Sequence, residues 1–170
     1  MSEQDKPEPD SEQTTIPTTG RLLGIDFGTV RVGVAICDES QSIASPHETY
    51  NRRNEKLDAD YFVKLVDETH AVGFVVGLPL HMSGDESQKS QEARQFGDWI
   101  NQLTGLPVDW IDERYSTAFA KEKLAASNLS AKQRKSRLDK IAAQAILATY
   151  LDSDRSDPSD PSNGKNLSVD

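Results

Sequence analysis

The sequence predicts an α/β fold in which a five-stranded mixed sheet, ordered 3-2-1-4-5, is flanked by helices. Two short apolar runs, 22–25 and 30–37, are joined by a turn that contains Gly28, which is the pattern of a hairpin. A later run, 72–77, is apolar on both faces, as in a central parallel strand that helices cover on each side. The hairpin and the parallel strand together indicate a mixed sheet.

The segment between these runs supplies a third strand and a first helix. Residues 42–50 predict a strand that Pro46 confines to a sheet edge or an irregular end, because proline cannot donate to the ladder. Residues 57–66 repeat apolar side chains at helical spacing, which predicts an amphipathic helix. The loop 77–84 has glycines at both ends and follows the parallel strand, at the carboxyl edge where α/β sheets place their sites.

The C-terminal half continues with helices around a last strand. Residues 87–103 predict a second helix, and residues 106–111 predict the fifth strand. Good capping residues predict a further helix over about 116–127. The polar, basic segment 128–137 has no periodicity and predicts a mobile loop, so the last helix is expected to start near Leu138.

Both ends of the chain are expected to stay outside the core. The first 19 residues hold five acids, one lysine and three prolines with almost nothing apolar, so burial cannot offset the entropy of ordering them. From Asp152 on, Asp, Ser, Pro and Asn dominate. We therefore expect a disordered acidic arm over 1–19, one domain over 20–151, and a disordered acidic tail over 152–170.

The charge of the chain is concentrated in these tails. The whole chain carries a net charge of −9, but without the tails 18 acids and 16 bases remain, a net charge of −2. Overall acidity therefore says little about partners. One basic cluster stands out and indicates either phosphate binding or a solvated surface: Lys121, Lys123, Lys132, Arg134, Lys135, Arg137 and Lys140.

Composition argues against several classes of protein. The one cysteine, Cys37, lies in an apolar strand and is expected to pack as a small hydrophobe. His47, His70 and His81 have no metal-ligand spacing with one another or with Cys37, which argues against a zinc site. No segment is apolar enough to span a membrane, and the N-terminus has no signal-peptide pattern, so we expect a cytoplasmic protein.

Three acids far apart in the sequence can meet in this topology. Asp26 ends the first strand, Glu113 follows the fifth, and Asp139 starts the last helix. Asp112 is the alternative to Glu113, because strand alternation lets only one of the two adjacent acids face the centre. Simpler interpretations exist as well: Asp26 as a turn residue and Asp139 as a first-turn partner of the helix dipole.

Carboxylates gathered without His or Cys suit a hard, oxygen-seeking cation, so Mg²⁺ or Mn²⁺ is the expected cofactor. Two such ions in one site activate a water and stabilise the leaving oxygen of a phosphodiester, so a two-metal site is our expectation. The candidate catalytic residues and metal ligands are therefore Asp26, Glu113 and Asp139.

Four motifs in residues 21–151 carry a resemblance to a known family. They are Gly24-x-Asp26-x-Gly28-x-x-Arg31-x-Gly33, Gly77-Leu78-Pro79-Leu80-x-Met82-x-Gly84, Asp112-Glu113-Arg114-x-Ser116-Thr117 and Asp139-x-x-Ala142-Ala143. In this order and spacing they resemble the pre-16S ribosomal RNA nuclease family, also called the YqgF family of Holliday-junction-resolvase-like proteins. Two positions depart from the family pattern, Asp85 and Tyr115, and both affect the loops around the centre rather than the three acids.

The resemblance implies an RNase H-like fold and a cytoplasmic nuclease that matures the 5′ end of 16S ribosomal RNA in ribosome biogenesis. Cleavage of DNA Holliday junctions is the alternative. It implies that Asp26, Glu113 and Asp139 form the catalytic centre, and that nucleic acid, and with it the small-subunit precursor, is the partner. The residues expected to contact substrate phosphates are Arg31, Arg114, Lys132, Arg134, Lys135 and Arg137.

Two other classes compete with a nuclease. Actin-like ATPases and sugar kinases also have an Asp-x-Gly-Thr loop after a strand, as at Asp26, but they need a second similar domain, for which this chain is too short. A ribosome-assembly or nucleic-acid-binding factor could keep the acids without catalysis. The sequence leaves RNA and DNA open as substrates, because phosphate contacts do not report the sugar.

Overall fold

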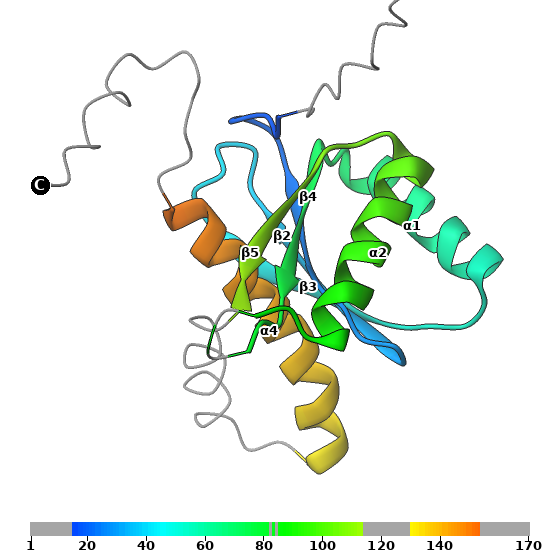
Figure 1. Cartoon of the computed structure of the whole chain (residues 1–170). Helices are drawn as coiled ribbons and strands as arrows, with labels where there is room; N and C mark the ends of the chain where they lie inside the picture. Colours follow the sequence, from blue (N-terminus) through cyan, green and yellow to red (C-terminus); the bar gives the residue numbers. More distant parts are fainter. Residues whose placement is uncertain (1–14, 82, 84, 114–129, 154–170) are drawn as a thin grey trace, which may run out of the picture.

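One five-stranded mixed sheet forms the centre of this computed structural model, which describes residues 15–81, 83, 85–113 and 130–153. The strands are β1 (Leu22–Asp26), β2 (Arg31–Cys37), β3 (Ala44–Asn51), β4 (Gly73–Leu78) and β5 (Val108–Asp112). They are ordered β3-β2-β1-β4-β5 (Figure 1). The pairs β1–β2 and β2–β3 are antiparallel, whereas β1–β4 and β4–β5 are parallel. The predicted sheet order 3-2-1-4-5 is therefore confirmed.

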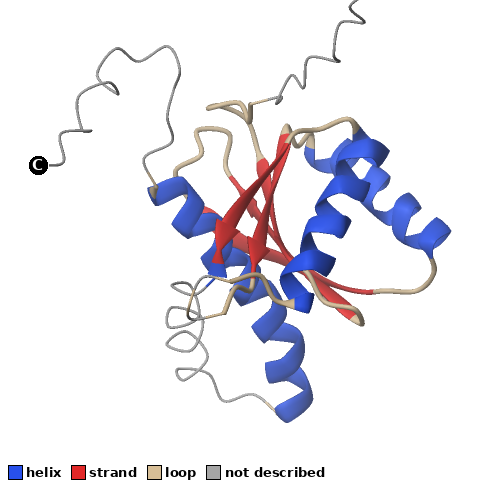
Figure 2. Cartoon of the chain, viewed as in Figure 1, coloured by secondary structure: helices blue, strands red, loops and turns tan. Residues whose placement is uncertain are grey.

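Helices cover both faces of the sheet (Figure 2). Helices α1 (Glu55–Thr69) and α2 (Gln88–Thr104) pack on one face, and α4 (Ala131–Asp152) packs on the other. Each helix has a polar N-cap: the side chains of Asn54, Ser87 and Ser130 accept hydrogen bonds from the first turns. The caps satisfy amide groups that the helices themselves leave unpaired.

Successive side chains of β1 are buried on opposite faces of the sheet. Leu23 and Ile25 join the apolar cluster under α1 and α2, while Leu22 belongs to the cluster under α4. This is the period-2 alternation of a strand covered on both faces. Asp26, one residue beyond Ile25, therefore continues the row that faces α4.

The third strand is an edge strand, as Pro46 predicts. Strand β3 pairs only with β2 in the described sheet, and its register shifts between Val34 and Ala35, where Pro46 lies opposite Ala35. Because proline has no N–H to donate, it interrupts the ladder where an irregularity is already present.

The last helix begins earlier than predicted. The expected loop over 128–137 is wrong from Ala131 onward, because α4 starts there behind an N-cap at Ser130. Ser130 and Gln133 form a capping box, the Ser-x-x-Gln signal of a helix start. The described side chains of its first two turns are exposed, which is why these turns show no apolar periodicity. The helix expected over 116–127 lies outside the described residues.

The ordered chain also begins before residue 20. Ile16 is only 7% exposed and packs into the cluster under α4. The Gln41 side-chain amide donates to the carbonyls of Pro17 and Gly20, each at 2.9 Å, and so ties this segment to the β2–β3 connection. The domain boundary expected at residue 20 thus falls inside a packed segment. None of the helices in the described ranges is long and apolar enough to cross a membrane.

The packing of Ile16 predicts the outcome of a truncation. A fragment of residues 15–153 should keep the thermal midpoint of the full chain, whereas a fragment that starts at residue 20 should melt several degrees lower. In the full chain, Ile16→Ala should cost roughly 2 kcal/mol of unfolding free energy, because it empties a buried site. The matched control is Ile43→Ala, because Ile43 is 65% exposed. Equal midpoints for both fragments would show that residues 15–19 contribute nothing to the core.

Candidate functional site

The carboxyl ends of three adjacent strands form one edge of the sheet. Asp26 is the last residue of β1, and Glu113 follows β5 directly. Strands β1, β4 and β5 run parallel, with Ile25 opposite Val76 and Leu78 opposite Asp112. Their ends therefore lie together, although 87 residues separate the two acids in the sequence.

Asp26 and Glu113 are in direct contact through a side-chain hydrogen bond. Two carboxylates can share a hydrogen bond only if one holds a proton. Burial, followed by the negative charges of Glu113 and Asp139, raises the pKa of Asp26 to about 8. Burial also raises the pKa of Glu113, although the hydrogen bond from Asp26 opposes this shift. Asp26 is therefore the member of the pair that holds the proton at neutral pH in the metal-free protein.

This contact also distinguishes Glu113 from Asp112, the two adjacent acids at the end of β5. The carboxyl of Glu113 meets Asp26, whereas Asp112 acts on Glu113 as a neighbouring negative charge. Gly77 on β4 makes the approach of Glu113 possible. A Cβ atom at Gly77 would collide with Glu113 Oε1 and would lie 2.6 Å from Ile146 Cδ1 of α4. A larger residue at this position would displace the carboxyl from the edge.

Asp139 approaches the same edge of the sheet from helix α4, which covers one face of the sheet. It lies in α4, which rests directly on the backbone of β2, because a Cβ atom at Gly33 would overlap the Asp139 carbonyl. The Asp139 carboxylate accepts a hydrogen bond from Arg31 Nε at 2.8 Å. Arg31 begins β2, so this ion pair joins the hairpin to the helix. The negative charge of Asp139 is felt at Asp26, whose pKa it helps to raise.

The donor chemistry of this edge fits a divalent cation. Within the described ranges, no three Asp, Glu, His or Cys side chains are already grouped closely enough to hold a metal ion. The three acids nevertheless supply only carboxylate oxygens, the ligands that Mg²⁺ and Mn²⁺ prefer. Their mutual repulsion also leaves a site where added positive charge would be favourable. Asp26, Glu113 and Asp139 would be the residues to hold such an ion.

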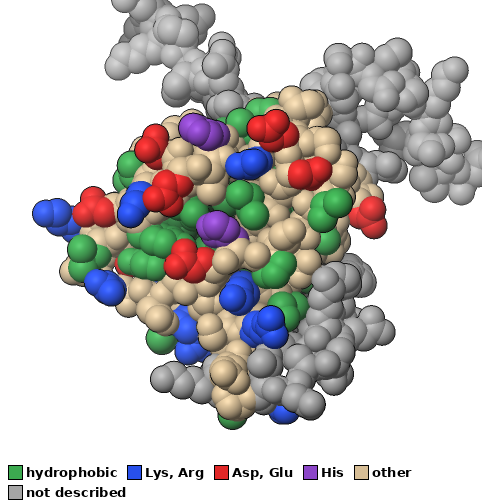
Figure 3. All heavy atoms as spheres, turned by 180° about the vertical axis from the view of Figure 1, so that it is seen from behind, with side chains coloured by type: hydrophobic (Ala, Val, Ile, Leu, Met, Phe, Trp, Pro, Cys, Tyr) green, Lys and Arg blue, Asp and Glu red, His purple; other side chains and the backbone are tan. Residues whose placement is uncertain are grey.

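The predicted phosphate contacts are only partly within the described residues. Arg134 and Arg137 are exposed in the first two turns of α4, shortly before Asp139. Figure 3 shows Lys and Arg side chains in the lower half of the rear face, the end of the molecule at which α4 begins. Arg31 is engaged with Asp139. The side chains of Lys132 and Lys135, and the whole of Arg114, lie outside the described part.

Two features of the site were missed from the sequence. Lys89, in the first turn of α2, lowers the pKa of Glu113 through its charge and so lies near the carboxylates. The expected helix start at residue 87 could have pointed to it, because that helix follows a loop at the carboxyl edge. The Arg31–Asp139 ion pair spans 108 residues, and no local pattern indicates it.

Comparisons with known proteins agree with the motifs. The family model described as "RuvX: Holliday junction resolvase" matches residues 20–153. A relative from Rhodopirellula baltica is 43% identical over 82% of this chain and 80% of its own length, and one from Rhodobacter capsulatus is 38% identical over 84% and 90%. Both relatives are named, provisionally, as pre-16S rRNA nucleases.

Among solved structures, the chain is similar to Thermus thermophilus RuvC in complex with a Holliday junction substrate, with 15% identity over 77% of this chain and 93% of that one and a TM-score of 0.48. The family and relatives define the class of this protein, a nuclease that hydrolyses phosphodiester bonds. The chain belongs to the RuvX family.

The raised pKa of Asp26 predicts how stability depends on pH. In the unfolded chain Asp26 loses its proton near pH 3.8, the ordinary pKa of an aspartate, whereas in the folded protein it keeps the proton to about pH 8. Between these values the folded state binds more protons, so Asp26 makes the protein less stable as the pH rises. In EDTA, Asp26→Asn should therefore raise the thermal midpoint by several degrees near pH 7.5 and by much less near pH 4.5.

The matched control is Asp60→Asn, because Asp60 is an exposed acid of α1, which covers the other face of the sheet. Its midpoint should follow wild type at both pH values. If Asp26→Asn has no advantage at pH 7.5, the carboxylates do not repel one another as the structure indicates.

Proposed function

We propose that this chain is a Mg²⁺- or Mn²⁺-dependent nuclease that processes the 5′ end of pre-16S rRNA in the cytoplasm, as part of ribosome biogenesis. The proposal rests above all on the Asp26–Glu113 contact, a half-buried pair of carboxyl groups at the carboxyl edge of the sheet. The names of the relatives support the RNA substrate. The small-subunit precursor is the proposed partner, because it carries that substrate.

Each of the three acids has its own role in the proposed mechanism. Asp26 and Glu113, which share one proton in the metal-free protein, would hold the cation from the ends of parallel strands. Asp139 completes the site from α4, where the guanidinium of Arg31 orients its carboxylate. When bound, Mg²⁺ or Mn²⁺ supplies activation of the attacking water and stabilisation of the leaving oxygen.

Cleavage of four-way DNA junctions is the second candidate function. The observation in its favour is the description of the matching family model as a Holliday junction resolvase. Both candidates use the same carboxylates, so they differ in the substrate that the surrounding surface accepts. A direct comparison of a 5′-extended 16S precursor with a four-way DNA junction, each with and without Mn²⁺, decides between them.

Catalysis by the carboxylates predicts a large effect of Asp26→Asn. This change keeps the shape of the side chain but removes a charge that holds the cation. It should lower Mn²⁺-dependent cleavage of the 16S precursor by at least about 100-fold, and a second change, Asp139→Asn, should add little, because the residues act as a unit. RNA binding in EDTA should persist, and the control Asp60→Asn should cleave normally.

Wild-type cleavage by purified Asp26→Asn would mean that the active site lies elsewhere. If wild-type protein binds the precursor but cuts neither substrate with any divalent ion, the protein is a binding factor instead.

The exposed arginines of α4 predict the salt dependence of binding. We propose that Arg134 and Arg137, with Lys132, Lys135, Arg114 and Arg31, contact substrate phosphates. Changing Arg134 and Arg137 together to Gln should reduce the log–log salt slope of RNA binding by about one unit per lost phosphate contact. The paired control is Lys56→Gln with Lys64→Gln, which removes the same charge from α1. An unchanged slope in the arginine variant would show that the start of α4 is only a solvated surface.

A further inference from the structure

A pocket lies on the face of the sheet that α1 and α2 cover, beside the carboxylate edge. Its volume is about 500 Å³, within the range of small-molecule sites. The walls come from the turn after β1, the segment between β3 and α1, and the middle of α2. The lining residues that define its chemistry are Phe27, Arg52, Arg53, Gln95, Phe96 and Trp99.

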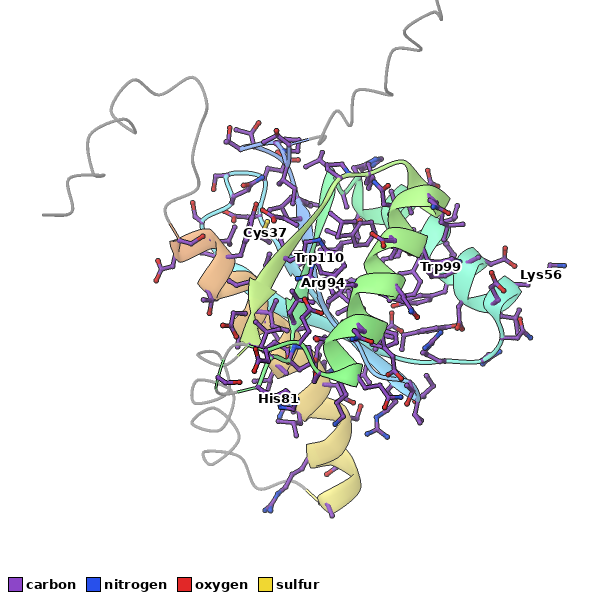
Figure 4. All side chains as sticks on the ribbon, in the orientation of Figure 1. Cys37, Lys56, His81, Arg94, Trp99 and Trp110 are labelled. Atoms are coloured by element: carbon purple, nitrogen blue, oxygen red, sulfur yellow. The ribbon has the colours of Figure 1, made fainter. Side chains whose placement is uncertain are left out.

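Aromatic rings form one continuous wall of this pocket. The ring centroids of Phe27 and Phe96 are 5.0 Å apart, and those of Phe96 and Trp99 are 5.6 Å apart. Phe27 and Trp99 are only half-buried, so part of each ring surface is accessible. Figure 4 shows Trp99 on the side of α2 that faces α1. Rings held in this way offer a stacking surface that fits any nucleobase.

The two arginines at the pocket differ in their partners. Arg52 is braced: its Nε lies 3.3 Å from Asp58 Oδ2, and its guanidinium lies 5.3 Å from the centre of the Phe27 ring. Arg53 uses its backbone N–H to reach Asp58, and its side chain makes no ion pair with any carboxylate in the described ranges. The Arg53 guanidinium is thus available for a phosphate at the mouth of the pocket.

The polar lining favours a base rather than a phosphate inside the pocket. Glu55 and Glu92 also line it, and these carboxylates would repel a phosphate group. Carboxylates and amides, such as that of Gln95, do pair with the amino and carbonyl groups on base edges. Stacking rings, base-edge partners and one outer cation together match a nucleotide whose base points inward.

The pocket and the carboxylates are linked by two consecutive residues of the chain. Asp26 and Phe27 are consecutive, so their Cα atoms are about 3.8 Å apart. The negative charge of Asp139 in α4 acts on Asp26, whereas the Phe27 ring packs on Phe96 of α2. The two side chains therefore serve opposite faces of one sheet edge. A nucleic-acid strand that crosses this edge can reach both of them.

We propose that this pocket holds one unpaired nucleobase of the substrate strand, next to the phosphodiester at the carboxylates. The proposal rests on the proposed nuclease function and adds to it a requirement for an unpaired nucleotide beside the cleavage point. Trp99 and Phe27 stack on the base, Gln95 contacts its edge, and Arg53 contacts its phosphate. A fully paired strand cannot deliver a base into the pocket unless that base first leaves its stack.

The test measures binding of short single-stranded RNA in EDTA, so that cleavage plays no part. Trp99→Leu should weaken binding about 5- to 100-fold, because a stacked base is lost. Arg53→Gln and Gln95→Ala should each weaken it several-fold. The matched control is Lys56→Gln, which removes the same charge three residues from Arg53 but at the outer end of α1 (Figure 4). A ribose-phosphate strand without bases should bind wild type more weakly than RNA does, and neither Trp99→Leu nor Gln95→Ala should weaken its binding further.

Several results would overturn the proposal. Wild-type RNA binding by both Arg53→Gln and Gln95→Ala would do so, as would an equal loss in Lys56→Gln or equal affinity for RNA and the base-free strand. The result for Trp99→Leu counts only if its thermal midpoint shows that the variant is folded. If it is not folded, Arg53→Gln and Gln95→Ala alone test the proposal. If the variants bind weakly as expected but wild type never cleaves RNA, the pocket stands and the nuclease proposal fails.

Discussion

The close contact between α4 and the sheet is the constraint on which the site depends. At Gly24, an added Cβ atom would lie 2.7 Å from Leu147 Cβ and 2.9 Å from the Ala143 carbonyl. At Gly33 it would overlap the helix backbone itself. The helix therefore rests on main chain instead of on side chains. Only this short separation brings Asp139, at a partly exposed point of the helix, within electrostatic range of a strand end.

The drawback of this arrangement is electrostatic. Asp26 and Glu113 are enclosed by the same packing that positions them, so burial and mutual repulsion act together against their charged forms. A shared proton relieves the pair, and Arg31 neutralises Asp139. In the metal-free protein a proton and a guanidinium thus offset the negative charge of the three acids. The repulsion that lowers the stability of the fold at these residues is the same repulsion that would favour the proposed cation.

Much of the architecture follows from local sequence patterns, and much of the site does not. The strand order and the edge position of β3 were predictable, because hairpin spacing, a doubly apolar strand and Pro46 are local signals. The choice of Glu113 over Asp112 as the partner of Asp26 needed the register of β5, which no periodicity reports. The ion pair of Arg31 with Asp139 depends on a contact between β2 and α4 that only tertiary packing creates. The early start of α4 was signalled by Ser130 and Gln133, but the lack of apolar spacing concealed it.

Pro46 has a consequence beyond the ladder that it interrupts. The outer edge of β3, the longest strand, is one of the two edges at which the described sheet could accept another chain, and the edge of β5 is the other. A proline and a register shift in the same stretch remove a donor and bend the strand, and both make the edge a poor template for intermolecular pairing. The features that protect against aggregation thus lie in β3, at the opposite edge of the sheet from β5. They therefore do not limit which residues can stand at the ends of β1 and β5, where Asp26 and Glu113 lie.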